Sequence, residues 1–286
     1  MALVQSHRNL PVVVIRGGGD LGSGVAYRLY VTGYPLVITE LEHPLLVRRA
    51  VSFGSAMFDG MTSVEGITAR RIESTSAVWL TLNTDEIPVL LDTDDTWRKL
   101  KPRAVIDARV AKRNIDTTLD DAELVIGLGP GFVAGEDCHV VIETNRGHRL
   151  GRVIRRGGAE PNTGVPGNVM GAGARRVLRA PAPGYVIAQV AIGDHVAEGQ
   201  VVATVGEASV TAPFDGVVRG LIHESVVVDT GVKIGDIDPR AVRENCFIIS
   251  EKSLAIGGGV LEALLTHGIH PLPLTELARG SHYAAL

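Results

Sequence analysis

Residues 12–22, VVVIRGGGDLG, are the stretch that decides the fold. The run at 12–15 is short, fully apolar and β-branched, which is typical of a parallel strand buried on both faces. Gly17, Gly19 and Gly22 follow it at once in a G-x-G-x-x-G pattern that leads into a segment with helical periodicity. Strand, glycine turn and helix in this order predict the opening unit of an α/β fold.

A second apolar run, Leu36–Ile38, predicts the next strand and ends at Glu40. An acid about 20 residues beyond the glycines is where a Rossmann unit binds ribose. Asp20 disagrees with that interpretation, because a carboxylate at the expected N-cap would occupy the amides that otherwise hold a pyrophosphate. Two interpretations therefore stay open: a nucleotide-type site, and a glycine turn that serves packing alone.

Further strands are predicted at 89–91, 104–109 and 124–126, with a short helix at 94–102. In open α/β sheets, ligands lie beyond the carboxyl ends of the strands. We therefore expect the glycine turn, Glu40 and Arg109 to gather at one edge of a parallel sheet. Cations in this half that could attract an anionic ligand are Arg16, Arg48, Arg49, Arg109, Lys112 and Arg113.

Residues 126–167 are dense in glycine, proline and charged residues around one predicted strand at 138–144. Alternation along that strand places His139 and Glu143 on the same face. Such a group could hydrogen-bond a heterocycle or ligate a metal, but no H-x-x-x-H spacing is present, so we predict no metal site.

From about residue 177 the sequence repeats itself at a spacing of 32 residues, with an A-P-x-x-G turn at Ala180 and again at Ala212. Two related halves of short strands resemble the biotinyl/lipoyl carrier domain. The hairpin between the halves, 205–209, has no lysine to modify, so we expect a structural or docking domain. A strand at 247–250 and a helix are expected to return to the first sheet, and Gly257–Gly259 predict close approach of another backbone or a ligand.

Composition narrows the function classes. The 286 residues are 45% hydrophobic with a formal net charge of −4 and no long basic run, which argues against nucleic acid as a partner. No signal-peptide-like start and no apolar run of about 18 residues is visible, so we expect a cytoplasmic protein without a membrane partner. The two cysteines indicate neither a disulfide framework nor a metal site.

The predicted fold class is α/β, with a Rossmann-like parallel sheet domain and a small all-β barrel-sandwich domain of biotinyl/lipoyl type. The predicted domains are a nucleotide- or cofactor-binding domain at 1–150, a Gly/Pro-rich linker at 151–176, the β domain at 177–238 and a returning strand and helix at 239–286. The predicted binding residues are Arg16, Gly17, Gly18, Gly19, Asp20, Gly22, Glu40, Arg109, Gly127, Gly129, Gly131, His139, Glu143, Arg146 and His148.

Five blocks carry a resemblance to a family: IRGGGDLGSGVAYRL at 15–29, TELEHPLLVRRAVSF at 39–53, the block at 127–154, NTGVPG at 162–167 and LAIGGGVLEALL at 254–265. They resemble the YqeB-type accessory proteins of selenium-dependent molybdenum hydroxylase systems, related in role to XdhC-type maturation factors. The resemblance implies a helper in making or inserting a molybdenum–pterin cofactor, with the hydroxylase as partner, and carries over no catalytic residue.

Three functions follow as expectations. The first is a maturation protein that binds a dinucleotide or a molybdopterin-type anion. The second is an NAD(P)-dependent oxidoreductase, and the third is a non-catalytic scaffold that docks the hydroxylase. The cofactor stays unknown between molybdopterin-type and NAD(P), whether the protein is an enzyme stays open, and a homo-oligomer is compatible with the sequence.

Overall fold

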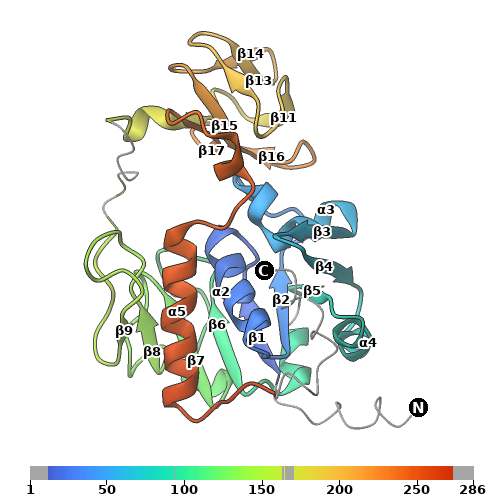
Figure 1. Ribbon diagram of the computed structural model, residues 1–286, viewed down its shortest axis with the longest axis vertical. Helices are drawn as coiled ribbons and strands as arrows, with labels where there is room; N and C mark the ends of the chain where they lie inside the picture. The colour runs from blue at the N-terminus through green and yellow to red at the C-terminus, as the bar shows by residue number, and fades with distance from the viewer. Residues whose placement is uncertain (1–11, 94, 163, 165–170, 273–286) are drawn as a thin grey trace.

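The computed structural model describes residues 12–93, 95–162, 164 and 171–272. A nine-stranded sheet forms the larger domain, in the spatial order β3-β4-β5-β2-β1-β6-β7-β8-β9 (Figure 1). Its strands are β1 (Val13–Arg16), β2 (Leu36–Glu40), β3 (Met61–Val64), β4 (Ile67–Ile72), β5 (Ile87–Leu91), β6 (Ala104–Asp107), β7 (Leu124–Leu128), β8 (Val140–Ile142) and β9 (Val153–Ile154). The apolar run at 12–15 thus supplies the central strand, which pairs in parallel with β2 and β6.

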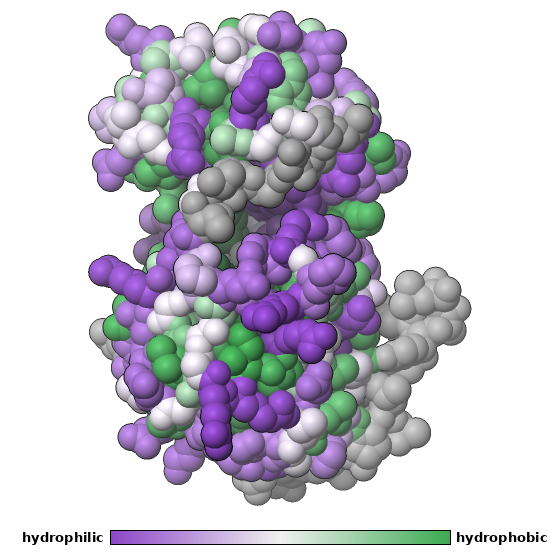
Figure 2. Space-filling view, turned by 90° about the vertical axis from the view of Figure 1, so that its left-hand side faces the viewer, coloured by the Kyte–Doolittle hydropathy of each residue, from purple (hydrophilic) through white to green (hydrophobic). Residues whose placement is uncertain are grey.

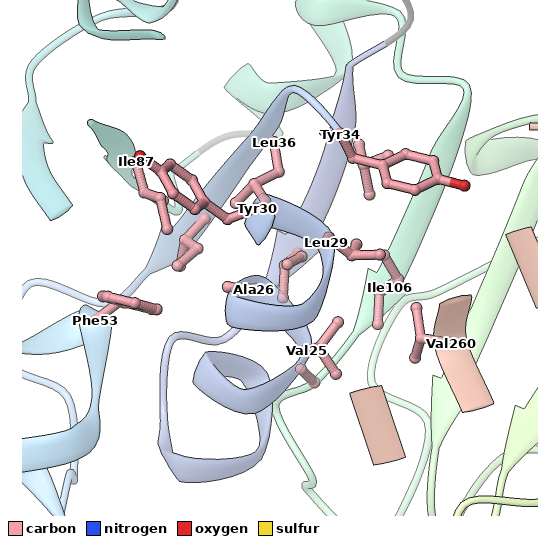
Figure 3. Packing of buried hydrophobic residues seen from close by; sticks show 14 of the residues in the cluster. Val25, Ala26, Leu29, Tyr30, Tyr34, Leu36, Phe53, Ile87, Ile106 and Val260 are labelled. Carbon is pink, nitrogen blue, oxygen red and sulfur yellow. The ribbon is translucent and has the colours of Figure 1, made fainter. Parts of the chain in front are cut away.

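Both faces of the sheet are buried, as the β-branched run predicts. Val13 and Ile15 face one core with α2 (Asp20–Val31) and α5 (Glu251–Thr266), which lie side by side on the same face (Figure 1). Figure 3 shows Val25 and Leu29 of α2 packed among Ile106 and other core residues. Val12 and Val14 face the opposite core, around Trp97. The short helices are α3 (Ala56–Asp59) and α4 (Val78–Asn83).

Helices α2 and α5 cross with almost no side-chain layer between them. A Cβ on Gly24 would lie 2.5 Å from the Ser253 Cβ, and a Cβ on Gly257 would lie 2.7 Å from the Gly24 carbonyl oxygen. A Cβ on Gly259 would overlap the carbonyl oxygen of Gly151. The prediction of close approach by another backbone is therefore confirmed at Gly257 and Gly259, whereas a Cβ on Gly258 would meet nothing within 4 Å.

The smaller domain consists of two four-stranded antiparallel sheets, β10-β17-β15-β12 and β14-β13-β11-β16. Its strands are β10 (Val177–Arg179), β11 (Gly184–Ala188), β12 (His195–Val196), β13 (Val201–Val205), β14 (Ala208–Thr211), β15 (Gly216–Leu221), β16 (Val227–Val228) and β17 (Lys233–Asp238). The repeat is visible in the backbone: the amide of Gly199 donates to the Ala212 carbonyl at 2.9 Å, and that of Gly231 donates to the Ala180 carbonyl at 2.8 Å.

The predicted fold class, a Rossmann-like parallel sheet with a biotinyl/lipoyl-like barrel, is wrong. The large sheet is mixed, because the edge strands β3 and β9 run antiparallel to their neighbours. Glu65 and Gly66, both at positive φ, form the two-residue turn that connects β3 to β4. Strands β3 and β4 contain exposed and half-buried residues, so they lack the fully apolar run that marks a buried strand in the sequence. The smaller domain is two separate antiparallel sheets.

Two local predictions also differ from the structure. The segment predicted as a helix at 94–102 is a 3-10 helix over Thr96–Leu100, and Asp94 lies outside the described residues. Residues 247–250 form no strand; they lead from a 3-10 turn to Ser250, the N-cap of α5. Most of NTGVPG lies outside the described residues. Within the described part of the chain, we find no helix with the length and apolarity needed to cross a membrane.

Candidate functional site

The glycine turn after β1 packs against the protein's own backbone. Gly17 has a φ of +101°, and the amide of Gly54 donates to the Gly18 carbonyl at 2.9 Å. A Cβ on Gly18 would lie 2.7 Å from the Gly54 nitrogen. These contacts account for glycine at Gly17 and Gly18 without any ligand, which is the packing interpretation left open by the sequence.

Glu40 fastens this turn to the end of β2. Its Oε2 accepts from the Gly18 amide at 2.8 Å and its Oε1 from the Leu41 amide at 2.8 Å, and the residue is only 8% exposed. Burial raises the pKa of Glu40, the two amides oppose that shift, and the nearby Asp92 carboxylate adds to it. The acid expected to bind ribose therefore already has two hydrogen-bond donors from the protein.

Asp20 lies at a different position from the one expected. The N-cap of α2 is Gly19, and Asp20 is the first residue of the helix, without a side-chain cap bond. Its carboxylate accepts from Arg48 Nη1 at 3.0 Å and from Ser253 Oγ at 2.9 Å. The group that was expected to repel phosphate at a cap instead ties α2 to α5.

A cleft of about 780 Å³ opens at the carboxyl ends of β1, β2, β5 and β6. This is the edge at which the sequence predicts a ligand, and we call this space the edge cleft. Of the predicted binding residues, those that line it are Arg16, Gly17, Gly19, Asp20, Glu40 and Arg109.

Two arginines in the edge cleft are already paired with carboxylates. Arg16, 2% exposed, donates to Asp116 at 2.7 Å and to Asp92 at 3.4 Å. Arg109 donates to Asp107 at 2.5 Å and to Asp116 at 2.6 Å. Burial acts to raise the pKa of Asp116, but hydrogen bonds from Arg16 and Arg109 outweigh it and hold that pKa well below its usual range.

The edge cleft as a whole is acidic. Five carboxylates and two guanidinium groups line it; the carboxylates belong to Asp20, Glu40, Asp92, Asp95 and Asp116. The expectation that arginines would make this edge attractive to an anion is therefore wrong. Carboxylates in excess favour a neutral or positively charged ligand that donates hydrogen bonds.

Apolar side chains form the lip of the edge cleft. Leu41, Leu45 and Ile115 line it and are 60%, 57% and 55% exposed. Large aliphatic groups around a polar floor are usual in small-molecule sites. Val110, also in the lining, has a φ of +52°, which is strained for a β-branched residue. Backbone strain of this kind gathers at ligand sites.

The glycines of the central block serve packing. A Cβ on Gly127 would overlap the Phe132 ring, and a Cβ on Gly129 would overlap the Thr144 hydroxyl. Gly131, at a φ of +108°, lies against the backbone of Arg113. None of these three glycines lines the edge cleft.

The polar residues of the block are dispersed. His139 lies where β8 begins, with Nδ1 accepting from the Val125 amide at 3.0 Å; burial lowers its pKa, and His267 lowers it further. Glu143 is 1% exposed and accepts from the amides of Asn145 at 2.7 Å and Glu160 at 2.8 Å. These two side chains therefore stabilise the local chain and do not converge on a common site.

Arg146 and His148 lie in different surroundings. Arg146 forms an ion pair with Glu251 and lines a second cleft, of about 520 Å³, between the two domains. His148 is exposed and lines neither cleft. In the described residues, no group of three or more His, Cys, Asp or Glu side chains is placed to hold a metal ion. The second cleft, here called the junction cleft, includes basic residues of the small domain that the sequence analysis did not single out.

A mixed-sheet α/β domain with an acidic edge cleft, joined to a two-sheet β domain, defines the class of protein. No protein-family model matches the chain. Among curated proteins it is 51% identical over 255 residues to the uncharacterized protein YqeB of Escherichia coli strain K12, covering 89% of this chain. The chain belongs to the YqeB family. It spans about half the length of that relative, 47%.

Some solved structures also align, at low similarity. An aspartoacylase family protein from Mesorhizobium loti is 13% identical over 79% of this chain and 84% of that one, with a TM-score of 0.26. The ectoine utilization protein EutE from Ruegeria pomeroyi is 9% identical over 79% of this chain and 86% of that one, with a TM-score of 0.24. A succinylglutamate desuccinylase from Silicibacter sp. TM1040 is 13% identical over 79% of this chain and 84% of that one, with a TM-score of 0.24. Scores this low assign neither fold nor activity to this chain.

The predicted function is corrected. The acidic lining of the edge cleft is unsuited to the dinucleotide or molybdopterin-type anion expected there. The maturation role, the NAD(P)-dependent alternative and the docking scaffold are withdrawn. The predicted partners, domain boundaries and cytoplasmic location stay predictions.

Proposed function

We propose that the edge cleft binds a small organic molecule with a positively charged or hydrogen-bond-donating end and an apolar body. The excess of carboxylates over guanidinium groups in its lining is the observation that carries the proposal. An ammonium group can pair with these carboxylates as an arginine does, because each can donate several hydrogen bonds to carboxylate oxygens.

Among the carboxylates of the edge cleft, Asp92 is the best placed to bind the cationic end of such a ligand. Its side chain is 12% exposed, and its one ion pair, with Arg16, is long at 3.4 Å. The Asp92 amide donates to the Glu40 carbonyl at 2.8 Å, so the two acids lie on adjacent chain segments at the floor of the cleft. A ligand cation near both would relieve the repulsion that raises the pKa of Glu40.

The test uses alkylammonium chlorides of increasing chain length and sodium carboxylates of matched length, at constant ionic strength. We expect the ammonium series alone to raise the melting temperature, by more as the chain lengthens, because the tail covers Leu41, Leu45 and Ile115.

Asp92→Asn should weaken alkylammonium binding about tenfold, the effect of losing roughly 1.4 kcal/mol from one charged hydrogen bond. Leu45→Ser should remove the dependence on chain length and leave methylammonium binding unchanged. Glu207→Gln, on an exposed hairpin of the small domain, is the charge-matched control. Equal responses to ammonium and carboxylate ligands, or an Asp92→Asn variant that responds like the natural protein, would overturn the proposal.

A further inference from the structure

The junction cleft has the opposite charge to the edge cleft. Seven cationic and three acidic side chains line it, the cations being Arg48, Lys112, Arg146, Arg176, Arg219, Lys233 and Lys252. They come from both domains, and Figure 2 shows hydrophilic residues gathered along the junction on one face of the molecule. The edge and junction clefts adjoin, since Gly19, Asp20 and Val110 line both.

Arg219, on β15, is the least satisfied group in the junction cleft. The residue is 9% exposed, and its buried Nε has no hydrogen-bond partner within the described chain. Its nearest carboxylate contacts are 3.7 Å from Nη1 to Asp236 and 3.8 Å from Nε to Asp238. A buried guanidinium without hydrogen bonds is costly, and such groups are normally paired.

The acids near Arg219 have other partners. Arg176 Nη1 donates to both oxygens of Asp236 at 2.9 Å, and Arg240 donates to Asp238 at 2.6 Å. Burial lowers the pKa of Arg219 and Arg48 of the large domain lowers it further, while the carboxylates of Asp236, Asp20 and Asp238 oppose that shift. Because its two ion pairs are long, Arg219 can still donate hydrogen bonds to an anion in the cleft.

Two lysines also line the cleft, Lys233 and Lys252. Burial lowers the pKa of Lys233, which lies 4.0 Å from Asp236, and burial together with Arg146 lowers that of Lys252. Lys252 is the second residue of α5, where the positive end of the helix dipole disfavours a cation. An anion in the cleft would stabilise both charges.

We propose that the junction cleft binds a small molecule through a doubly charged oxyanion, a phosphate or paired-carboxylate group, held by Arg219, Lys233 and Lys252. Because these residues come from β15, β17 and α5, the bound group would bridge the two domains. The inference does not rest on the function proposed for the edge cleft.

The test is calorimetric titration of the full chain with inorganic phosphate and, separately, malonate, at fixed ionic strength in chloride. We expect saturable binding of at least one of them, and the stronger of the two identifies the oxyanion. Arg219→Met should lower that affinity at least tenfold while the melting temperature stays equal or rises, because a buried charge with only long ion pairs is replaced by an aliphatic chain.

Lys252→Gln gives a second measure in case Arg219→Met fails to fold, and it should also lower affinity at least tenfold. Arg179→Gln is the matched control, since Arg179 is exposed and donates to the Gly231 carbonyl outside the cleft. Asp92→Asn should leave phosphate or malonate binding unchanged, which separates this site from the edge cleft. Absence of saturable binding of either anion, or unchanged affinity in Arg219→Met or Lys252→Gln, would overturn the proposal.

Discussion

At the scale of single residues, carboxylate partners decide what this chain can bind. In the sequence, the position of Glu40 suggests a dinucleotide site and that of Asp20 argues against one, but the protein engages both: Glu40 by the Gly18 amide and Asp20 by Arg48 and Ser253. A motif fixes which residue types lie near the turn. The motif does not reveal the partners of those residues, because Arg48 and Ser253 are remote from Asp20 in sequence.

The pairing of Asp116 predicts a pH dependence of stability. Its folded pKa is lowered, so the stabilisation it gives is present above the unfolded pKa of about 3.9 and is lost as the pH falls through the lower folded value. Asp116→Asn should therefore lose stability at neutral pH and show a shallower decline below pH 4.

Urea unfolding of the natural protein and of Asp116→Asn, from pH 7 down to pH 3, measures this effect. The side chain of Asp116 is 45% exposed, so solvent screening keeps its contribution small. Parallel stability curves for the two proteins over the whole range would show that Asp116 does not contribute through its ionised form.

At the scale of elements, much of the central sheet follows from the sequence. The strands predicted at 12–15, 36–38, 104–109 and 124–126 each overlap a strand of the sheet, because burial on both faces leaves a short apolar run in the sequence. The edge strands β3 and β9 lack that signature, and the turn at Glu65–Gly66 has none of the asparagine or aspartate that usually marks such hairpins.

The packing of α5 against the Gly151 backbone gives a prediction with an internal control. Gly259→Ala should destabilise the fold by about 1–3 kcal/mol, because the new methyl group overlaps the Gly151 carbonyl oxygen. Gly258→Ala, one residue earlier on the exposed side where a Cβ meets nothing within 4 Å, should stabilise it by up to about 1 kcal/mol.

Thermal and urea unfolding of both variants separates these effects. The free energy of unfolding is expected to fall in Gly259→Ala and to rise in Gly258→Ala, although the two residues are neighbours in one helix. If Gly259→Ala is as stable as Gly258→Ala, α5 does not pack as closely against the Gly151 backbone as the structure indicates.

At the scale of the whole molecule, two clefts of opposite charge meet at the N-terminal end of α2. The segment after β2 connects the domains: Arg49 Nε donates to the Leu221 carbonyl at 2.9 Å, and a Cβ on Gly220 would lie 2.6 Å from the Val47 carbonyl oxygen. The junction cleft could not be found from sequence, because its cations are scattered from Arg48 to Lys252 and only the folded chain collects them. The rule for strand ends predicts a ligand at the edge where the edge cleft lies, and that ligand stays a prediction; the rule does not predict the excess of carboxylates in the lining.

The most direct test of the central claim is a crystal structure of the protein with hexylammonium. The account predicts the nitrogen within hydrogen-bonding distance of Asp92, and the alkyl chain along Leu41, Leu45 and Ile115. A structure at saturating hexylammonium in which the edge cleft is empty, or holds the molecule with its nitrogen turned away from the carboxylates, would contradict it.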